Sequence, residues 1–474
     1  MRVVPSILLL LTLLGGCLGG PTTDPEPTDA PTSQPGPAAT KPDFDFSTAI
    51  QTNHDHQETE EHGLAFGMEL VGHDFMDEAM RTGANPGGFN EVSVGSRLAV
   101  VSNFGPHRVF SVVDISDPSD PVHLSDFWGS DFTTPARAGA SSAWGVTIFP
   151  EDDLVIVSLQ AMGNPPLPGS EDQQGGGLFL VNLDDPKRPV EESFTSVVDA
   201  EALIPVGVHT VRVFEANGTR YAAASTANGE TILYELVGEK PERTLREISR
   251  ARGMHDTTVQ IHPLTGQRII YGAQGGVYLT DISDIQDPEI LAFVPNGQDG
   301  LSAYHQVVPN DVLVDGRHYT VAATESSDGN PTPFTIMDTT DPTDVTVVGQ
   351  WRLPLVVPPP HSGSPYRYTG HNVDFDRGRL YIGHAHAGVW VIDVSSTANA
   401  AEPFPVAFYQ PHEDVLHVPF NPFSLTDIPA TWSAYRHTDG YVYASDCNTG
   451  LYILQVTEPP SPLENATVYP HNVR

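Results

Sequence analysis

Four histidines recur at one position of a pattern that repeats along the chain. His209, His255, His305 and His371 each begin a short segment that contains Val or Thr and has the length of a strand. Neutral imidazole is the commonest side-chain ligand for copper and zinc. Histidines from equivalent positions would form a metal site if the fold made those positions converge. We therefore treat these four residues as candidate ligands for copper or zinc.

Loops expected on the same face supply further candidate ligands. His384 and His386 lie in one such loop, and Glu325, His107 and Cys447 lie in the corresponding loops of other repeats. A structural explanation stays open for all the histidines. Repeats inherit residues by duplication, and an imidazole can hydrogen-bond to the backbone of a neighbouring repeat.

Motifs of the common enzyme classes are missing from the sequence. It has no Gly-x-Ser-x-Gly elbow, phosphate-binding loop, His-Glu-x-x-His pair or dinucleotide-binding fingerprint. Hydrolase, kinase and dehydrogenase functions therefore lack a motif, and no catalytic residue is assigned. Carboxylates are so abundant that a glycosidase pair can be neither picked out nor excluded.

The charge balance is strongly acidic. The 60 acidic residues outnumber the 23 basic ones and give a formal net charge of -37, which argues against nucleic acid as a partner. Only three of the basic residues are lysines. An acidic, lysine-poor composition resembles that of haloarchaeal proteins. Calcium binding is the competing explanation for the carboxylates, but no Asp-x-Asp-x-Asp-Gly loop supports it.

One sequence phrase returns seven times and organises the chain. It is an aliphatic or aromatic run that leads into an acidic turn. The copies are VFSVVDISDP (109–118), LFLVNLDDP (178–186), a degenerate ILYEL (232–236), VYLTDIS (277–283), FTIMDTTDP (334–342), VWVIDVS (389–395) and the weaker LYILQV (451–456). Asp and Pro suit a turn between strands, so we expect a structural role for the repeated aspartates.

The elements around each copy are short apolar runs bounded by turn residues, which indicates strands. With about 45 to 65 residues and four strands per unit, each unit has the size of a propeller blade. The sequence therefore predicts an all-β, seven-bladed β-propeller of four-stranded blades. The innermost strand of every blade begins at the same face near the axis, which is where the four histidines are expected to meet.

The repeated phrase resembles the LVIVD repeat, in which such a strand leads into Asp-x-Ser-Asp-Pro. This resemblance covers nearly everything from about residue 64 onward and implies a propeller. Members of that family share no single activity, so it implies nothing definite about function. The seventh unit lacks an outer strand, which MELVGH (68–73) can supply because it resembles TVVGQ (346–350). We expect this N-terminal strand to close the ring and remove exposed sheet edges.

The N-terminal region has the pattern of an exported lipoprotein. Arg2 precedes an apolar run at residues 3–14 that is too short for a permanent transmembrane helix. The run ends at Gly15-Gly16-Cys17, which resembles a lipobox, although an ordinary signal peptide that contains a cysteine remains the alternative. We predict a signal peptide at residues 1–16, a lipidated Cys17 with a disordered Pro- and Thr-rich stalk to residue 45, and the propeller at residues 46–474.

Two classes of function fit these features. The first is a binding or scaffolding module, anchored at the cell surface through its lipid, that presents a rigid face to a protein or glycan and needs no cofactor. The second is a copper- or zinc-dependent oxidoreductase that uses the histidines at the propeller axis. Other seven-bladed propellers, such as nitrous oxide reductase, hold copper in this way, but only the geometric idea transfers to this chain.

Overall fold

The structure is a computed structural model, and it describes most of the chain from residue 39 onward as one compact unit. The described residues are 39–49, 64–76, 88–104, 108–129, 141–149, 151, 153–161, 176–197, 207–226, 229–252, 255–296, 304–326, 331–354, 367–411, 429–457 and 460–469. The predicted signal peptide, Cys17 and most of the predicted stalk lie outside these residues, as does His107.

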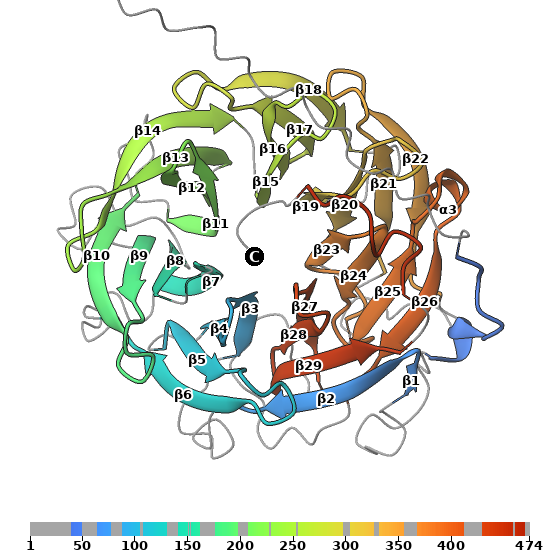
Figure 1. The fold of residues 1–474 in the computed structure, drawn as a ribbon, viewed down its shortest axis with the longest axis horizontal. Coiled ribbons are helices and arrows are strands. Elements are labelled where there is room, and N and C mark those ends of the chain that lie inside the picture. Colours follow the sequence, from blue (N-terminus) through green and yellow to red (C-terminus); the bar gives the residue numbers. More distant parts are fainter. Residues whose placement is uncertain are drawn as a thin grey trace, which may run out of the picture. The chain divides into compact units, whose positions relative to one another are not determined.

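Seven antiparallel sheets surround a central channel and form a seven-bladed β-propeller (Figure 1). Blade one consists of β3 (Phe89–Val94), β4 (Leu98–Asn103), β5 (Phe110–Asp114) and β6 (Val122–Phe127). Blade two consists of β7 (Ser141–Ile148), β8 (Leu154–Ala161), β9 (Gly177–Asn182) and β10 (Val190–Ser196). Blade three consists of β11 (Val208–Ala216), β12 (Thr219–Thr226), β13 (Glu230–Val237) and β14 (Thr244–Arg252). Blade four consists of β15 (Thr257–Ile261), β16 (Arg268–Ala273), β17 (Gly276–Asp281) and β18 (Glu289–Pro295).

The remaining three blades complete the ring, and the first strand of every blade is its innermost one. Blade five consists of β19 (Tyr304–Pro309), β20 (Tyr319–Thr324), β21 (Phe334–Asp338) and β22 (Thr346–Trp351). Blade six consists of β23 (Val373–Asp376), β24 (Arg379–Gly383), β25 (Val389–Asp393) and β26 (Phe404–Tyr409), with the short helix α3 (Thr397–Ala401) before β26. Blade seven combines β27 (Thr431–Arg436), β28 (Val442–Asp446) and β29 (Gly450–Val456) with the N-terminal β2 (Met68–Asp74).

Ring closure by the N-terminal strand is confirmed. Met68 of β2 pairs with Val456 of β29, so the first full strand of the chain completes the last blade. The two-residue strand β1 (Ala65–Phe66) adds a fifth strand to blade six, next to β26. Upstream of it, Phe44 stacks on Phe66 with ring centroids 4.3 Å apart. Residues upstream of β1 thus pack against blade six, where Asn399 also donates to the carbonyl of Ala39.

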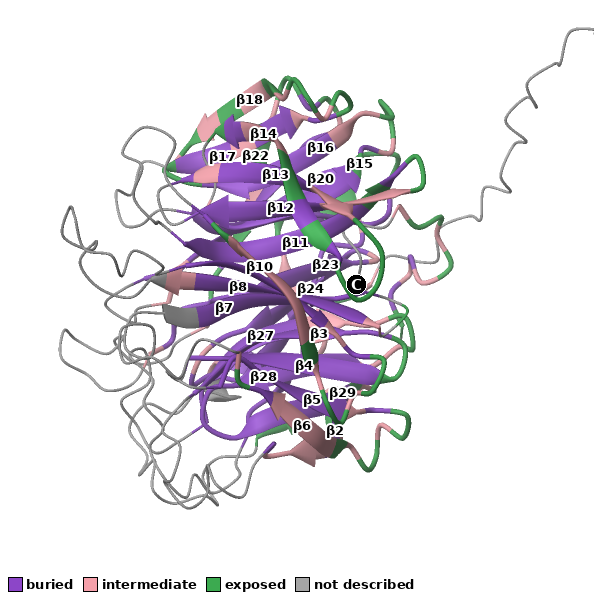
Figure 2. Cartoon of the chain, turned by 90° about the vertical axis from the view of Figure 1, so that its left-hand side faces the viewer, coloured by how far each residue is buried: buried purple, intermediate pink, exposed green. Residues whose placement is uncertain are grey.

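The core lies between neighbouring blades rather than within one of them. Val100 and Val112 of blade one pack with Val146 and Val157 of blade two in a single buried cluster. Most residues of the inner strands are buried, whereas the outermost strands carry most of the exposed positions (Figure 2). Each blade therefore depends on its two neighbours for burial, which explains why the edge blades need a strand to close the ring.

The repeated acidic turns have the structural role that the sequence predicts. Oδ1 of Asp114 accepts a hydrogen bond from the backbone N–H of Ser116 at 2.9 Å. Asp281 and Asp393 accept the equivalent bond two residues further along the chain. Because this bond stabilises the ionised form, it lowers the pKa of Asp114. The aspartates of the repeat are therefore turn residues.

Tight turns between the inner strands keep the blades compact. Asn217 and Gly218 connect β11 to β12 with φ angles of 52° and 74°, which is the left-handed region that a two-residue type I′ hairpin requires. Within the described residues, no helix has the length and apolar character needed to cross a membrane.

Candidate metal centre

The four predicted histidines lie together at one end of the central channel. His209 and His305 lie in the first residues of β11 and β19, whereas His255 and His371 lie two residues before β15 and β23. These four strands are the innermost strands of blades three to six, as the repeat register implies. The ring centroids of His209 and His255 are 3.9 Å apart, those of His255 and His305 are 4.8 Å apart, and those of His305 and His371 are 4.2 Å apart. The imidazoles thus form a continuous arc across four blades.

Aromatic side chains complete the circle at the same height. Trp144 of blade two lies against His209 at 4.8 Å, and Trp432 of blade seven lies against His371 at 3.6 Å between ring centroids. Phe104 contacts both tryptophans edge to face. Cys447, a candidate ligand from sequence, is buried in this apolar cluster. The channel mouth therefore has one polar half and one apolar half, so the histidines form an arc and not a full ring.

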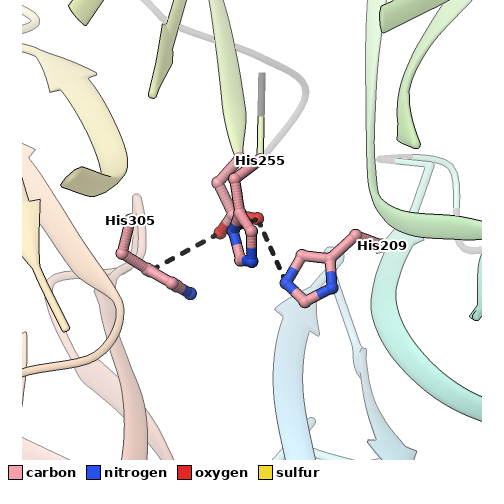
Figure 3. Close-up of side chains that lie close together, drawn as sticks. His209, His255 and His305 are labelled. Atoms are coloured by element: carbon pink, nitrogen blue, oxygen red, sulfur yellow. Dashed lines mark ion pairs between the residues drawn. The ribbon is translucent and has the colours of Figure 1, made fainter. Parts of the chain in front are cut away.

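Asp256 lies at the centre of the polar half, and the sequence reasoning did not single it out. Its Oδ1 is 3.7 Å from Nε2 of His209 and 3.6 Å from Nδ1 of His255. Its Oδ2 is 4.0 Å from Nδ1 of His305 (Figure 3). A signal for this residue exists: His255 alone among the four is followed by an acid, whereas the others precede Thr210, Gln306 and Asn372.

These distances are too long for hydrogen bonds, and the polar atoms are buried without other partners. The Asp256 side chain is 1% exposed, and among the described residues neither of its oxygens has a hydrogen-bond partner. Within the same part of the chain, both nitrogens of His305 and Nδ1 of His255 also lack one. Buried polar groups nearly always find partners, so these atoms are available to bind ordered water or a ligand.

The donor atoms are spaced as a metal site requires. His209, His255, Asp256 and His305 each offer one donor atom, and all four atoms lie within 4.8 Å of one another. Around an ion with bonds of about 2.0 to 2.1 Å, tetrahedral donors lie roughly 3.3 Å apart. The imidazole nitrogens lie 3.6 to 4.0 Å from the Asp256 oxygens, and the four donor atoms would have to move closer together to bind one ion. Three imidazoles and one carboxylate form a donor set that suits zinc or copper.

The pKa shifts favour the metal-binding form at His209, His305 and Asp256 but not at His255. Burial, followed by the charge of His255, lowers the pKa of His209 well below its usual value. Burial also lowers the pKa of His305, so both rings are neutral near pH 7 and each keeps a free lone pair. Burial opposes ionisation of Asp256, but the neighbouring imidazoles outweigh it and hold the pKa of this carboxyl well below normal. For His255, Asp256 and Glu325 overcome burial and raise the pKa.

A second contact orients one of the candidate ligands. Nδ1 of His209 lies 2.5 Å from Oε1 of Gln160 on β8. A carbonyl oxygen only accepts, so Nδ1 must carry the ring proton and Nε2 must present its lone pair. Nε2 is the atom that faces Asp256. A hydrogen bond that fixes the ligating tautomer in this way is typical of metal-binding histidines.

A second group of donors adjoins the first. His305, Glu325 and His371 offer donor atoms that lie within 4.8 Å of one another. Burial lowers the pKa of His371 well below normal, so its ring is neutral too. Glu325 and His371 also line a small pocket at the channel mouth, with Arg367, His386 and Trp432 among the other wall residues.

Two further predicted ligands lie away from both groups. His384 is buried beside Phe334 and Trp351, where burial lowers its pKa to about 3. Nδ1 of His386 accepts a hydrogen bond from the backbone N–H of Arg367 at 2.7 Å, which occupies this nitrogen. Ala385, between them, forms a backbone bridge to Thr431 of blade seven. That bridge holds the backbone of residues 384–386 against blade seven. The side chains of His384 and His386 belong to neither of the two donor groups described above.

A paired network lies further along the channel. Glu91 accepts hydrogen bonds from Arg212 at 2.5 Å and from the hydroxyl of Tyr435 at 2.7 Å. Asn372 adds a third at 3.3 Å. Glu91, Arg212 and Tyr435 also line a pocket in this part of the channel. The buried charges here are compensated, in contrast to Asp256.

Comparisons with known proteins support the repeat and the fold type. The model of the LVIVD repeat matches residues 108–127, which span β5 and β6. No curated protein sequence matches the chain. Among solved structures, the WD40 β-propeller domain of Doa1 is similar, with a TM-score of 0.43 and 10% identity over 83% of this chain and 97% of that chain. One segment of the chain thus matches the LVIVD repeat, and the seven sheets described above make it a β-propeller.

Proposed function

We propose that this propeller is a metal-binding protein whose axial site holds one divalent ion of the copper or zinc type. His209, His255, Asp256 and His305 would be its ligands. The observation that carries the proposal is the carboxylate of Asp256, which is buried among three imidazoles and has no hydrogen-bond partner for either oxygen among the described residues. Only imidazoles at 3.6 to 4.0 Å offset its charge, and a divalent ion would add direct bonds to its oxygens.

Water alone explains the site less well. The acceptors include both oxygens of Asp256, the free Nε2 of His209 and one nitrogen of neutral His305. A single water molecule donates only two hydrogen bonds and would leave part of this set unpaired. A divalent cation satisfies all of these lone pairs at once, and the carboxylate offsets half of its charge.

Metal analysis of the full-length chain, purified without a histidine tag, tests the proposal. After equilibration with equal concentrations of copper and zinc followed by dialysis, we expect at least one bound equivalent per chain. Asp256→Asn should lose at least 90% of that equivalent. The control is His318→Gln, which changes a buried histidine at the other end of the channel and should keep it. Less than 0.1 equivalent in the unchanged protein would refute the proposal.

The ion would give the predicted binding module a mode of action. The side chains of His255 and Glu325 are 40% and 29% exposed, so this edge of the site is open to solvent. A protein or glycan ligand with a carboxylate or hydroxyl group would complete the coordination there. We propose that the propeller binds such a ligand through the metal. The test is binding to an acidic glycan array with and without a chelator, and binding that the chelator does not weaken would contradict this role.

An oxidoreductase is the second candidate, and the imidazole-rich donor set favours it because such sites accept copper. Copper supplies one-electron chemistry when bound, whereas the protein would hold it and limit access through the channel mouth. If this role is correct, the copper-loaded protein should be reduced by ascorbate and reoxidised by dioxygen over repeated cycles. A site that takes zinc in preference to copper would exclude it.

Surface anchoring through Cys17 is a separate proposal that rests on the lipobox-like sequence and the stalk composition. The anchor would hold the propeller at the cell surface, in contact with the membrane only through its lipid. Cys17→Ser should move the protein from the membrane fraction to the medium. A variant that stays with the membrane would refute the lipid anchor and leave the metal site unaffected.

A further inference from the structure

His305 faces two carboxylates with its two ring nitrogens. Nδ1 lies 4.0 Å from Oδ2 of Asp256, and Nε2 lies 3.9 Å from Oε2 of Glu325. The imidazole is 3% exposed, and neither nitrogen has a hydrogen-bond partner among the described residues. A buried neutral imidazole normally uses its N–H and its lone pair, so both edges of this ring lack the group they are aimed at.

Each carboxylate has its own histidines. Asp256 lies between His209 and His255, whereas Glu325 belongs to the group that includes His371. His305 is the only residue that belongs to both donor groups found in the described chain. The imidazole arc therefore contains two sets of donors that meet at one ring.

We propose that His305 bridges two metal ions as an imidazolate. The first ion would be held by His209, His255 and Asp256, the second by Glu325 and His371, and each would take one nitrogen of His305. This inference rests on the proposed metal-binding function and extends it to a dinuclear centre. When the second ion binds, its bond to nitrogen replaces the remaining N–H bond of His305, and the proton passes to bulk water. The two carboxylates and the imidazolate then offset three of the four positive charges.

The two ions would differ in access. The first has four protein donors, of which only His255 has a substantially exposed side chain. The second has three protein donors, and two of them line the small pocket at the channel mouth. Closed four-donor sites are typically structural, and three-donor sites with an open position are typically reactive. The second ion is therefore the one that a small anion or hydroxyl compound from solvent would reach.

Copper serves as the probe, because two copper(II) ions that share an imidazolate are magnetically coupled. We expect two equivalents of copper in the untagged full-length chain and an electron paramagnetic resonance intensity well below that of two isolated ions. Glu325→Gln should remove one equivalent and restore the full signal of the other. This change keeps the side-chain shape at a partly exposed position, and circular dichroism of the metal-free variant would check its fold.

The outcomes separate the dinuclear centre from the simpler metal site. One equivalent that Glu325→Gln leaves unchanged would overturn the bridge while the single-ion site stands. Two equivalents with full, uncoupled signal would also overturn it. No bound copper would refute both proposals. His371→Ala provides a second variant with the same expectation as Glu325→Gln, in case one of them does not fold.

Discussion

Histidines lie at both ends of the innermost strands, and the two sets differ in how their nitrogens are hydrogen-bonded. His255 precedes β15 and His262 follows it. Nε2 of His262 donates to the carbonyl of Thr339 at 2.8 Å, and its Nδ1 accepts from the backbone N–H of Thr265 at 3.2 Å. The neighbouring His318 is equally well paired through Gln260 and Thr339, at 3.0 Å each.

His305 at the channel mouth is as deeply buried but lacks such partners. Among the described residues neither of its nitrogens has a hydrogen-bond partner, and the carboxylates of Glu325 and Asp256 lie 3.9 and 4.0 Å away. A buried imidazole is therefore no indication of function by itself. An unsatisfied imidazole is not sufficient either, because both nitrogens of buried His384 also lack a partner among the described residues and His384 belongs to neither donor group. The informative property is an unsatisfied imidazole that faces further unsatisfied donor atoms, as His305 does.

The largest expected difference between the two sets is their response to metal. At a copper or zinc concentration about 1,000 times the dissociation constant, we expect the free energy of unfolding to rise by about 4 kcal/mol per bound ion. Urea unfolding with and without metal measures this gain. Asp256→Asn should abolish it and His318→Gln should preserve it. An equal gain in both variants would mean that the metal binds elsewhere.

Removal of a paired histidine should come next in size. His318→Ala leaves a cavity and deprives Gln260 and Thr339 of their partner, so it should lower the free energy of unfolding by about 3 kcal/mol. The loss should be the same with metal or with a chelator in urea unfolding. A loss that depends on metal would show that the two ends of the channel are coupled.

The paired set should also determine part of the acid sensitivity. Burial, with a smaller contribution from His262, lowers the pKa of His318 to about 3. The folded chain then binds fewer protons at this residue than the unfolded chain, so stability is complete above about pH 6.5 and declines toward pH 3. We expect His318→Gln to reduce the slope by up to about 1.4 kcal/mol per pH unit within this window. Urea unfolding in chelator between pH 4 and 7 gives the slope, and an unchanged slope would contradict the assignment.

The smallest effect is expected for Asp256→Asn in the absence of metal. This change removes a buried carboxylate whose oxygens have no hydrogen-bond partner in the described structure, so little stability should be lost. We expect the free energy of unfolding in chelator to change by about 1 kcal/mol or less. A loss of several kcal/mol would indicate that Asp256 is structural and that its interactions with the imidazoles already compensate its charge.

The fold was predictable because the same sequence phrase occurs in every blade. The strong copies identify weak ones, such as residues 232–236, as members of the same repeat. The alignment of the repeats also places the four histidines at equivalent strand ends. Asp256 was not predicted because it occurs in a single repeat, and its place directly after His255 is a weak signal in a chain with 60 acidic residues. The positions of His384 and His386 depend on the backbone bridge between Ala385 and Thr431, which joins two blades. Such contacts between blades leave no local pattern in the sequence.

The pairing of β2 with β29 has a consequence for synthesis of the chain. The ribosome makes Met68 long before Val456, and at about 5 to 20 residues per second the interval is roughly 20 to 80 s. During that time β2 has no partner and blade one has no neighbour on one side. The nascent chain therefore carries an unpaired strand near its N-terminus until β29 has been made. A chaperone that covers this strand would shorten its exposure to other nascent chains.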